Sequence, residues 1–177
     1  GHALHAAWVW GISEAFGASL IFRIEDHDQS RCKEAFEKAI FEDISWLGFK
    51  WDNHLTVRQT ERNSRYLSVY RELADRGLLY SCKCSRKDVA AQNNLESGEL
   101  HYPGTCSRLN LPLDAPNTAV RVRIPDETFQ ANDLFRGVTF QNPAQQCGDF
   151  VIRDRNGSWT YQFNVVIDDL DHEIDAT

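Results

Sequence analysis

The sequence predicts an α/β fold built on a parallel sheet, with a smaller mixed subdomain inserted into it. Two observations predict the first layer: apolar residues recur at helical spacing over residues 3–76, and a short apolar run among them is typical of a buried strand. The third observation is a change of residue composition after Leu79, where the chain becomes polar and rich in turn-forming residues. We therefore expect an α/β layer over 1–80, an inserted subdomain over 81–148 and a return to the first layer over 149–177.

Three helices and one strand are predicted in the first layer. Small and aromatic residues at helical spacing predict a helix over 3–16, and the apolar run 19–24 predicts a buried strand. Two amphipathic helices are predicted over 32–47 and 60–76, and a glycine follows each predicted helix. The expected buried faces consist of Ala35, Phe36, Ala39, Ile40, Ile44 and Leu47 in the first and of Tyr66, Val69, Tyr70 and Leu73 in the second.

The inserted segment begins with a short helix. Ser85 and Asp88 have the spacing of a capping box, which predicts a helix start. A turn-rich stretch over 93–116 follows, and the run 119–124 then alternates apolar and basic residues. That alternation predicts a strand with one face in water, on which Arg121 and Arg123 are expected to lie.

A hairpin and a further apolar run complete the pattern. Residues 149–153 and 158–161 flank Asn156-Gly157, a dipeptide that favours a tight hairpin turn. The run 163–167 is apolar again and leads into two aspartates, which we interpret as the return to the first layer.

Composition excludes several classes of protein. The chain has 177 residues, with 19 Lys and Arg against 26 Asp and Glu, which gives a net charge of −7. Five Trp, five Tyr and ten Phe supply enough apolar surface for a core, which excludes disorder as the dominant state. No apolar run approaches the ~20 residues that a membrane span needs, so we expect no membrane partner. The acidic charge argues mildly against nucleic acid, although a local basic face is sufficient to bind phosphates.

The ends of the sequence suggest a piece of a longer protein. The chain has no Met, and residues 168–177 hold five carboxylates without a helix stop. No signal peptide is recognisable, because the first residues lack a basic segment. With an odd count of five cysteines, this predicts a cytoplasmic protein with reduced thiols.

Three of the cysteines suggest a zinc site. Cys82-x-Cys84 is followed by Cys106 in the turn-rich stretch, and zinc prefers four nitrogen or sulfur ligands in a tetrahedron. His101 is the fourth ligand that residue chemistry favours, and Tyr102 is the alternative, although its phenol ordinarily has a pKa near ~10. Ordinary buried cysteines are the competing interpretation.

The other two cysteines, Cys32 and Cys147, lie outside this pattern and are expected to be packing residues.

Acidic residues follow the predicted buried strand. Glu25 could accept a substrate ammonium there, because ligands of open α/β sheets bind at the carboxyl ends of strands. A solvated turn, in which Asp28 caps the next helix, fits the spacing equally well.

Taken together, these segments closely resemble the catalytic core of class I glutamyl-tRNA synthetases, and in particular the short glutamyl-queuosine tRNA(Asp) synthetase branch. The resemblance covers nearly the whole chain in order. It is carried by Gly1-His2 before a helix, FRIEDHD at 22–28, WLGFKWD at 46–52, QTERNSRY at 59–66, YSCKCS at 80–85 and YQFNVVIDD at 161–169.

The resemblance implies a Rossmann catalytic domain, incomplete at both ends, with an inserted zinc-bearing α+β subdomain. It implies ATP-dependent activation of L-glutamate, with Mg²⁺ expected beside the ATP, and transfer to queuosine in the anticodon of tRNA(Asp). No Lys-Met-Ser-Lys-like loop is present in this sequence, so we expect the chain as given to be inactive by itself.

Site residues are implied one by one. Gly1 and His2 resemble the second half of the HIGH signature, which lies against ATP at a helix N-terminus. Glu25 and Tyr161 match glutamate-binding positions. The matching zinc set is Cys82, Cys84, Tyr102 and Cys106, which favours the tyrosine over His101.

Two alternatives remain open. One is a fragment of an ordinary glutamyl-tRNA synthetase that charges tRNA(Glu), and the other is a non-catalytic, zinc-containing tRNA-binding paralogue. The branch assignment depends on two features. No Cys or His lies two residues after Cys106, and the loop from Cys84 to Tyr102 is short.

Overall fold

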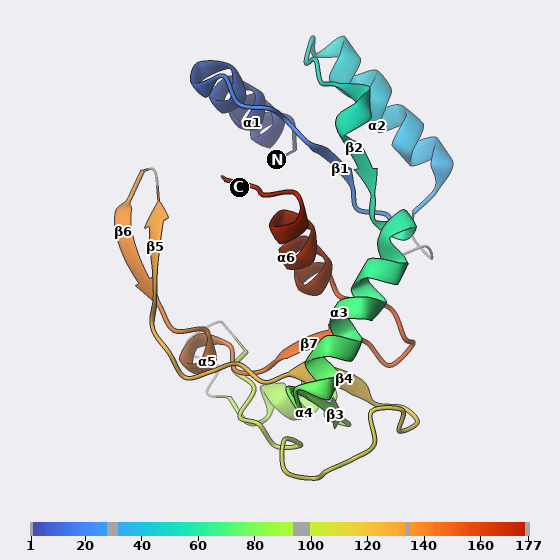
Figure 1. The fold of residues 1–177 in the computed structure, drawn as a ribbon, viewed down its shortest axis with the longest axis vertical. Helices are drawn as coiled ribbons and strands as arrows, with labels where there is room; N and C mark the ends of the chain where they lie inside the picture. Colours follow the sequence, from blue (N-terminus) through green and yellow to red (C-terminus); the bar gives the residue numbers. More distant parts are fainter. Residues whose placement is uncertain (1, 28–31, 94–99, 134, 176–177) are drawn as a thin grey trace. The chain divides into compact units, whose positions relative to one another are not determined.

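The chain forms two compact units, each of which is described by itself. The computed structural model describes residues 2–27, 32–93, 100–133 and 135–175 (Figure 1). The first unit spans Gly1–Arg65 and the second spans Tyr66–Thr177. Among the described residues, no helix has both the length and the apolar character needed to cross a membrane.

The first unit is built on a pair of parallel strands. Strand β1 (Phe22–Ile24) pairs with β2 (Thr56–Arg58), with Arg23 opposite Val57. Helix α1 (His2–Phe16) precedes β1, and α2 (Glu34–Trp46) lies between the two strands in sequence. Short 3-10 turns at Asn53–Leu55 and Gln59–Arg62 flank β2. The parallel pair confirms the α/β expectation, but β2 itself was missed because three residues carry no readable alternation.

Aromatic side chains form the interior of this unit. The rings of Trp10 and Phe49 lie 5.0 Å apart, and Trp51 lies 5.5 Å from Phe22 and stacks on Phe41 at 5.6 Å. Trp10 Nε1 also donates a hydrogen bond of 2.6 Å to the carbonyl of Lys50, which ties α1 to the segment before β2. These contacts join α1, β1 and α2 around one aromatic cluster.

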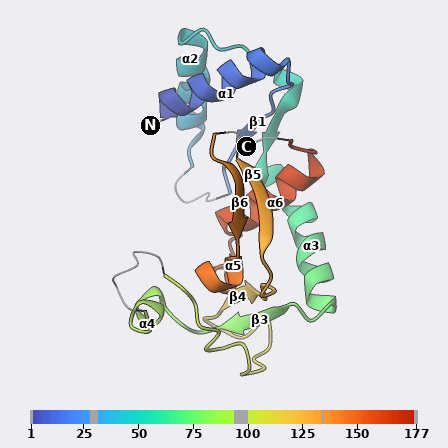
Figure 2. The same cartoon turned by 90° about the vertical axis from the view of Figure 1, so that its left-hand side faces the viewer.

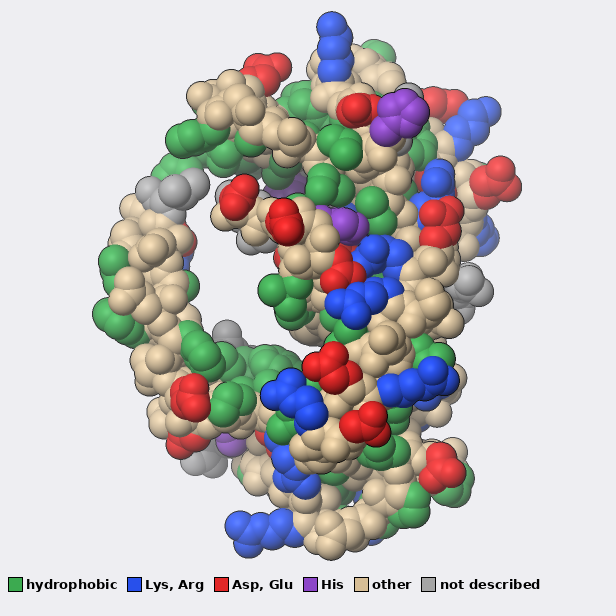
Figure 3. All heavy atoms as spheres, viewed as in Figure 1, with side chains coloured by type: hydrophobic (Ala, Val, Ile, Leu, Met, Phe, Trp, Pro, Cys, Tyr) green, Lys and Arg blue, Asp and Glu red, His purple; other side chains and the backbone are tan. Residues whose placement is uncertain are grey.

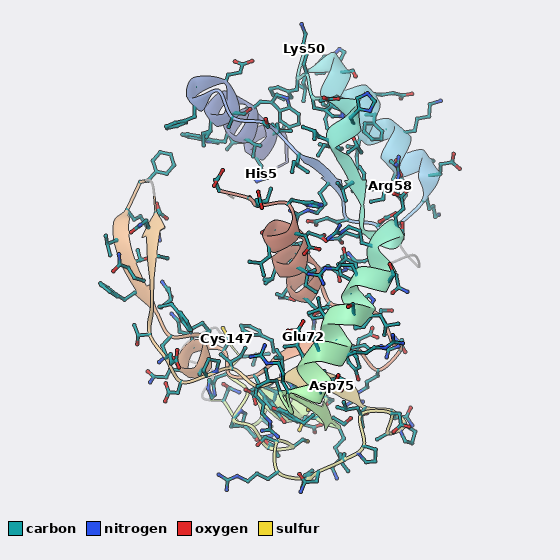
Figure 4. The ribbon with its side chains drawn as sticks, in the orientation of Figure 1. His5, Lys50, Arg58, Glu72, Asp75 and Cys147 are labelled. Atoms are coloured by element: carbon teal, nitrogen blue, oxygen red, sulfur yellow. The ribbon has the colours of Figure 1, made fainter. Side chains whose placement is uncertain are left out.

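The apolar face expected on α2 is only partly buried. Ile44 is buried, but Phe36, Ile40 and Leu47 are exposed in the described structure. Phe41, outside the expected face, supplies the aromatic contact instead. On the same helix Glu37 accepts two hydrogen bonds from Arg58 at the end of β2. Arg58 is labelled in Figure 4.

The second unit is organised around a three-stranded antiparallel sheet in the order β3-β4-β7. In this sheet β4 (Ala119–Val122) lies between β3 (Leu79–Cys82) and β7 (Phe150–Arg153). The remaining elements are α3 (Asn63–Asp75), α4 (Arg86–Ala90), β5 (Phe129–Asp133), β6 (Gly137–Gln141), α5 (Pro143–Gln146) and α6 (Tyr161–Asp171).

The two faces of this sheet carry two separate clusters. Leu79, Val120 and Ile152 pack with residues of α3 and α6 in one cluster, which is the larger apolar core. Side chains alternate along a strand, so Tyr80 and Cys82 face the other way and pack with Val89, Tyr102 and Cys106. The face expected on α3, from Tyr66 to Leu73, packs on the larger core as predicted.

Strands β5 and β6 form a separate hairpin. Phe129 lies opposite Gln141 and Asp133 opposite Gly137, and neither strand pairs with the main sheet. Figures 1 and 2 show this hairpin projecting away from β3 and β4, and Figure 3 shows apolar side chains along its outer surface. Phe129, Val138 and Phe140 on these strands are exposed.

The predicted hairpin at 149–161 is correct at its turn and wrong at its second strand. Gly157 has φ +84°, and Arg153 forms an antiparallel bridge with Trp159. Tyr161, however, begins helix α6 rather than ending a strand. Phe163 and Ile167 lie one turn apart on that helix and enter the larger core. The expected division into 1–80, 81–148 and 149–177 stays a prediction.

Candidate metal centre and substrate site

Three cysteines converge beneath the β3-β4-β7 sheet. Cys82 ends β3, Cys84 follows two residues later, and Cys106 comes from the loop before β4. The three Sγ atoms lie within 4.8 Å of one another, and Cys84 Sγ is 3.5 Å from Cys106 Sγ. The backbone turns away directly after Cys84, because the capping box of Ser85 and Asp88 starts α4 there. This confirms that the cysteine pattern marks one cluster.

Tyr102 is the fourth side chain of this cluster. Its Oη lies 3.3 Å from Cys82 Sγ and accepts a hydrogen bond of 2.8 Å from the backbone N–H of Cys106. His101 is directed elsewhere, since its Nε2 lies 3.0 Å from the carbonyl oxygen of Ala144. His101 therefore points away from the cysteines, and the choice of Tyr102 as the fourth ligand stays a prediction.

The donor set fits a tetrahedral zinc ion. A Zn–S bond of ~2.3 Å places two sulfurs of a tetrahedron about 3.8 Å apart. The Cys84–Cys106 separation of 3.5 Å is close to that spacing. The 3.3 Å between Cys82 Sγ and Tyr102 Oη is close to the shorter sulfur–oxygen spacing that follows from a Zn–O bond of about 2.0–2.2 Å. Three sulfurs and one phenol oxygen on two loops would also tie the turn-rich stretch to β3.

Protonation within the cluster is uneven when no metal is considered. Burial, together with the neighbouring Cys106 and Cys82, raises the pKa of Cys84 to about 11. Burial likewise raises the pKa of Tyr102 above its ordinary value. Burial also opposes ionisation of Cys106, but hydrogen bonds from the Lys83 backbone, Cys84 and Tyr102 outweigh it and lower the pKa of Cys106. A bound cation would displace the remaining protons, because zinc ligates thiolates.

The remaining cysteines are not part of the cluster. All five cysteines are free. Cys147, labelled in Figure 4, follows α5 and is half-buried, and its carbonyl accepts the Tyr102 N–H at 2.9 Å. Cys32 is exposed, which corrects its interpretation as a packing residue.

A polar network joins the carboxyl ends of β1 and β2 in the first unit. Asp26 accepts hydrogen bonds from the N–H of Thr60 at 2.9 Å and from its hydroxyl at 2.6 Å. His27 Nδ1 lies 2.7 Å from Oε1 of the buried Gln59. The sequence did not reveal that Asp26 and His27 bind the segment after β2, because neither β2 nor the role of Gln59 and Thr60 was recognised.

The network leaves Glu25 at the surface of the strand end. Glu25 is exposed, and its carbonyl accepts a long contact of 3.9 Å from Cys32 Sγ. Asp28 lies outside the described residues, and Lys33 occupies the N-cap position of α2. Glu25 is thus exposed to solvent, whereas the Asp26 carboxylate holds Thr60 in place.

The other predicted substrate residues are less defined. Tyr161 is half exposed at the first position of α6 in the second unit. Gly1 and the side chain of His2 lie outside the described part of the chain. The expectation that Glu25 and Tyr161 share a glutamate pocket stays a prediction.

The expected wet face of β4 is wrong for Arg121. Both faces of β4 are covered by packed side chains, and Arg121 is buried on the face that carries Tyr80 and Tyr102. Its guanidinium carbon lies 3.6 Å from the centre of the Tyr102 ring, and Nη1 donates to the carbonyl of Asp149 at 2.6 Å. Arg123 is exposed, although it donates to the carbonyl of Ser107. Arg121 is therefore no candidate for a phosphate contact.

Curated relatives share much of this sequence. The chain is 37% identical over 157 residues to the glutamyl-Q tRNA(Asp) synthetase of Pseudomonas syringae pv. tomato, covering 89% of this chain and 50% of that protein. It is 33% identical to the namesake from Rhodobacter capsulatus, covering 96% of this chain and 67% of that protein. Glutamate–tRNA ligase 2 of Acidithiobacillus ferrooxidans is 34% identical over 191 residues, covering 98% of this chain and 39% of that protein. The chain thus spans about half the length of several relatives it matches.

A solved structure and a family model agree with these matches. The crystal structure of a glutamate tRNA ligase from Elizabethkingia meningosepticum superposes with a TM-score of 0.72 at 22% identity, covering 96% of this chain and 38% of that one. This similarity shows the α/β catalytic fold of class I synthetases. The model for the catalytic domain of class I tRNA synthetases (E and Q) matches residues 1–177. The chain belongs to this family of class I glutamyl- and glutaminyl-tRNA synthetase catalytic domains.

Proposed function

We propose that the chain is part of a ligase that activates glutamate with ATP and transfers it to queuosine of tRNA(Asp). The observation that carries the proposal is the four-residue cluster of Cys82, Cys84, Tyr102 and Cys106, which fits zinc although no Cys or His lies two residues after Cys106. The names of relatives at 33–37% identity support the same branch.

The reaction has two steps. A carboxylate oxygen of glutamate attacks the α-phosphorus of ATP, and pyrophosphate leaves with its bonding electrons to give an acyl-adenylate. A hydroxyl of the queuosine cyclopentenediol then attacks the acyl carbon, loses its proton and releases AMP. The binding of glutamate and ATP in one orientation supplies the proximity that both steps need.

Each implied residue has a part in this proposal. Glu25 would accept the α-ammonium of glutamate in a charge-assisted hydrogen bond, and the exposure of Glu25 at a strand end is compatible with this role. Tyr161 would contact the same amino acid, and Gly1 and His2 would lie against ATP and its Mg²⁺. Zinc would be structural, because four protein ligands leave no open coordination position.

Removing the charge of Glu25 tests the glutamate site. We expect Glu25→Gln in the full-length parent to weaken glutamate binding by ~1–3 kcal/mol in calorimetry, because the ammonium loses an ionic partner. Glu34→Gln, at an exposed position of α2, is the matched control and should leave the affinity unchanged. Equal affinity of wild type and Glu25→Gln would reject the assignment.

The ordinary glutamyl-tRNA synthetase is the second candidate, favoured by the similarity to glutamate–tRNA ligase 2. Pyrophosphate exchange and charging assays on the full-length parent separate the two. The proposal expects exchange without tRNA and glutamate transfer to queuosine-containing tRNA(Asp), with unmodified tRNA(Asp) and tRNA(Glu) left uncharged. Exchange that strictly requires tRNA, together with charging of tRNA(Glu), would replace the proposal with the second candidate. A parent with neither activity that still binds tRNA would be a non-catalytic paralogue.

A further inference from the structure

Arg121 is a buried cation placed directly on the candidate metal centre. Its guanidinium carbon lies 3.6 Å from the centre of the Tyr102 ring, a distance at which the guanidinium plane stacks on the aromatic face. Nη1 donates to the Asp149 carbonyl at 2.6 Å, and Nε has no hydrogen-bond partner among the described residues. The guanidinium is thus fixed by the hydrogen bond from Nη1, and its plane lies over the Tyr102 ring.

The sheet fixes the arginine in this position. The pairing of β4 with β7 shifts register between Val120 and Arg121, directly beside the backbone of Arg121. Asp149 is itself anchored: its Oδ2 accepts the Tyr80 hydroxyl at 2.6 Å and its Oδ1 accepts the N–H of Ile124 at 2.9 Å. Arg121 therefore bonds to a carbonyl whose position several contacts determine.

The backbone of Tyr102 is fixed as tightly. Tyr102 bridges to Gly148, and its N–H donates to the carbonyl of Cys147 at 2.9 Å. A Cβ at Gly148 would lie 2.2 Å from the carbonyl oxygen of Tyr102, and Gly148 has φ +71°, so only glycine allows this approach. The ring of Tyr102 is consequently confined between its own fixed backbone and the guanidinium of Arg121.

The proposed zinc site carries a net negative charge that Arg121 can offset. Three thiolates and one phenolate around Zn²⁺ leave a net charge of −2, and Cys82, Tyr102 and Cys106 are buried. A buried negative centre is costly unless a cation lies nearby. Arg121 supplies a positive charge on the face of the ligand ring, in the same cluster and away from solvent.

We propose that Arg121 is a positioning residue of the metal centre, which orients the ring of Tyr102 and offsets the negative charge of the four-ligand site. The inference rests on the zinc site of the proposed function. It predicts that loss of the guanidinium weakens metal binding although Arg121 contributes no ligand atom. Partners that orient metal ligands typically change metal affinity 10–100-fold, and we expect a loss in the range of about 10–100-fold here.

Metal affinity of the purified full chain provides the test. Zinc affinity is measured by competition with a chromophoric chelator, and the coordination geometry is followed in the visible spectrum of the Co²⁺-substituted protein. Arg121→Met should lower zinc affinity about 10–100-fold and alter the Co²⁺ spectrum. Arg121→Lys should fall between wild type and Arg121→Met, because lysine keeps the charge but not the planar stacking surface.

A matched control is available on the same strand. Arg123 also lies over an aromatic ring, 4.7 Å from the centre of Tyr80, but it is exposed, and Tyr80 is not one of the candidate ligands. Arg123→Met should leave zinc affinity within about twofold of wild type. In a Tyr102→Phe background, Arg121→Met should have little further effect, since neighbours that act through one another are not additive.

The outcomes separate the two levels of the proposal. A wild-type chain that binds no zinc would overturn the zinc site and this inference with it. Zinc binding that is unchanged in a folded Arg121→Met variant, or an equal loss in the Tyr102→Phe background, would overturn only the positioning by Arg121. If Arg121→Met does not fold, a zinc affinity of Arg121→Lys equal to that of wild type would overturn the claim that stacking on Tyr102 supports metal binding.

Discussion

At the residue scale, a buried hydrogen-bonded pair joins two helices of the second unit. The hydroxyl of Tyr66 on α3 lies 2.9 and 3.0 Å from the two carboxylate oxygens of Asp168 on α6. Both residues are almost completely buried, so water cannot replace a lost partner. The pair therefore stabilises the packing of α3 against α6 beside the larger core.

Tyr66→Phe should lower the free energy of unfolding by about 1–3 kcal/mol, because the buried carboxylate loses a donor while the ring still fills its space. Urea denaturation of the chain measures the difference. Tyr161→Phe, which removes an exposed hydroxyl, is the control and should change stability by less than about 0.5 kcal/mol. Equal stability of the Tyr66→Phe and Tyr161→Phe variants would contradict this account.

At the element scale, the start of α4 depends on two reciprocal hydrogen bonds. Ser85 N–H donates to Asp88 Oδ2 at 2.6 Å, and Asp88 N–H donates to Ser85 Oγ at 3.2 Å. The Ser85 N–H, and to a smaller extent the Ser85 side chain, stabilise the Asp88 carboxylate, so the pKa of Asp88 lies below its ordinary value of 3.8. The cap starts a helix directly after Cys84 and so directs the chain away from the cysteine cluster.

This shift gives a pH dependence with a defined sign. A lowered folded pKa means that the contribution of Asp88 to stability is complete above about 3.8 and is lost as pH falls through the folded pKa. Ser85→Ala removes the side-chain hydrogen bond but keeps the N–H of residue 85, so it should raise the pKa of Asp88 only part of the way toward its ordinary value in an NMR titration of the side-chain carboxyl. Asp133 is the control: the backbone N–H groups of Arg136 and Phe135 lower its pKa, and Ser85→Ala should leave that pKa unchanged. An Asp88 pKa at or above its ordinary value in the wild-type chain would refute the capping explanation.

The β5–β6 hairpin is the element that depends least on a core. Both of its strands are exposed almost throughout, and a two-stranded hairpin by itself is marginal in water. Val138→Ser and Phe140→Ser should each change the free energy of unfolding by less than about 0.5 kcal/mol. Ile152→Ala, in the larger core, should cost about 2–5 kcal/mol in the same denaturation experiment. A large loss from either hairpin substitution would reveal packing that the exposed fractions do not indicate.

At the scale of the whole molecule, one sheet separates two clusters with different requirements. The face toward α3 and α6 buries aliphatic and aromatic side chains, whereas the opposite face holds the cysteines with Tyr80, Val89 and Tyr102. The second cluster has few apolar groups of its own. Its stability is therefore expected to depend on metal ligation, which is coupled to folding in such sites.

Metal removal should loosen one part of the chain selectively. A chelator such as EDTA is expected to increase hydrogen exchange within 81–118 while α3 and α6 keep their protection, because their core lies on the other face of the sheet. Mass-spectrometric exchange of the full chain, with and without chelator, resolves the two regions. Uniform exchange across both, or no change in 81–118, would contradict a metal-dependent subdomain.

Local pattern was sufficient wherever a feature depends on neighbours in sequence. Helical spacing and terminal glycines located α1, α2 and α3, since amphipathic periodicity and left-handed stops such as Gly48 at φ +79° are encoded within one segment. The capping box was equally readable from Ser85 and Asp88 alone. Cysteine spacing located the candidate metal centre, because two of its ligands are only two residues apart.

Tertiary structure decided which of these side chains face one another. His101 and Tyr102 are adjacent in sequence, and only the folded loop directs the phenol to the cysteines and the imidazole to Ala144. Arg121 alternates with apolar residues as an exposed side chain would, yet Tyr102 and its neighbours cover that face of the sheet. The partners of Asp26 and His27 are Thr60 and Gln59, which lie more than 30 residues away in sequence and are brought close only by the pairing of β1 with β2. Burial and pairing depend on which segments come together over long sequence distances, and that information does not reside in any one segment.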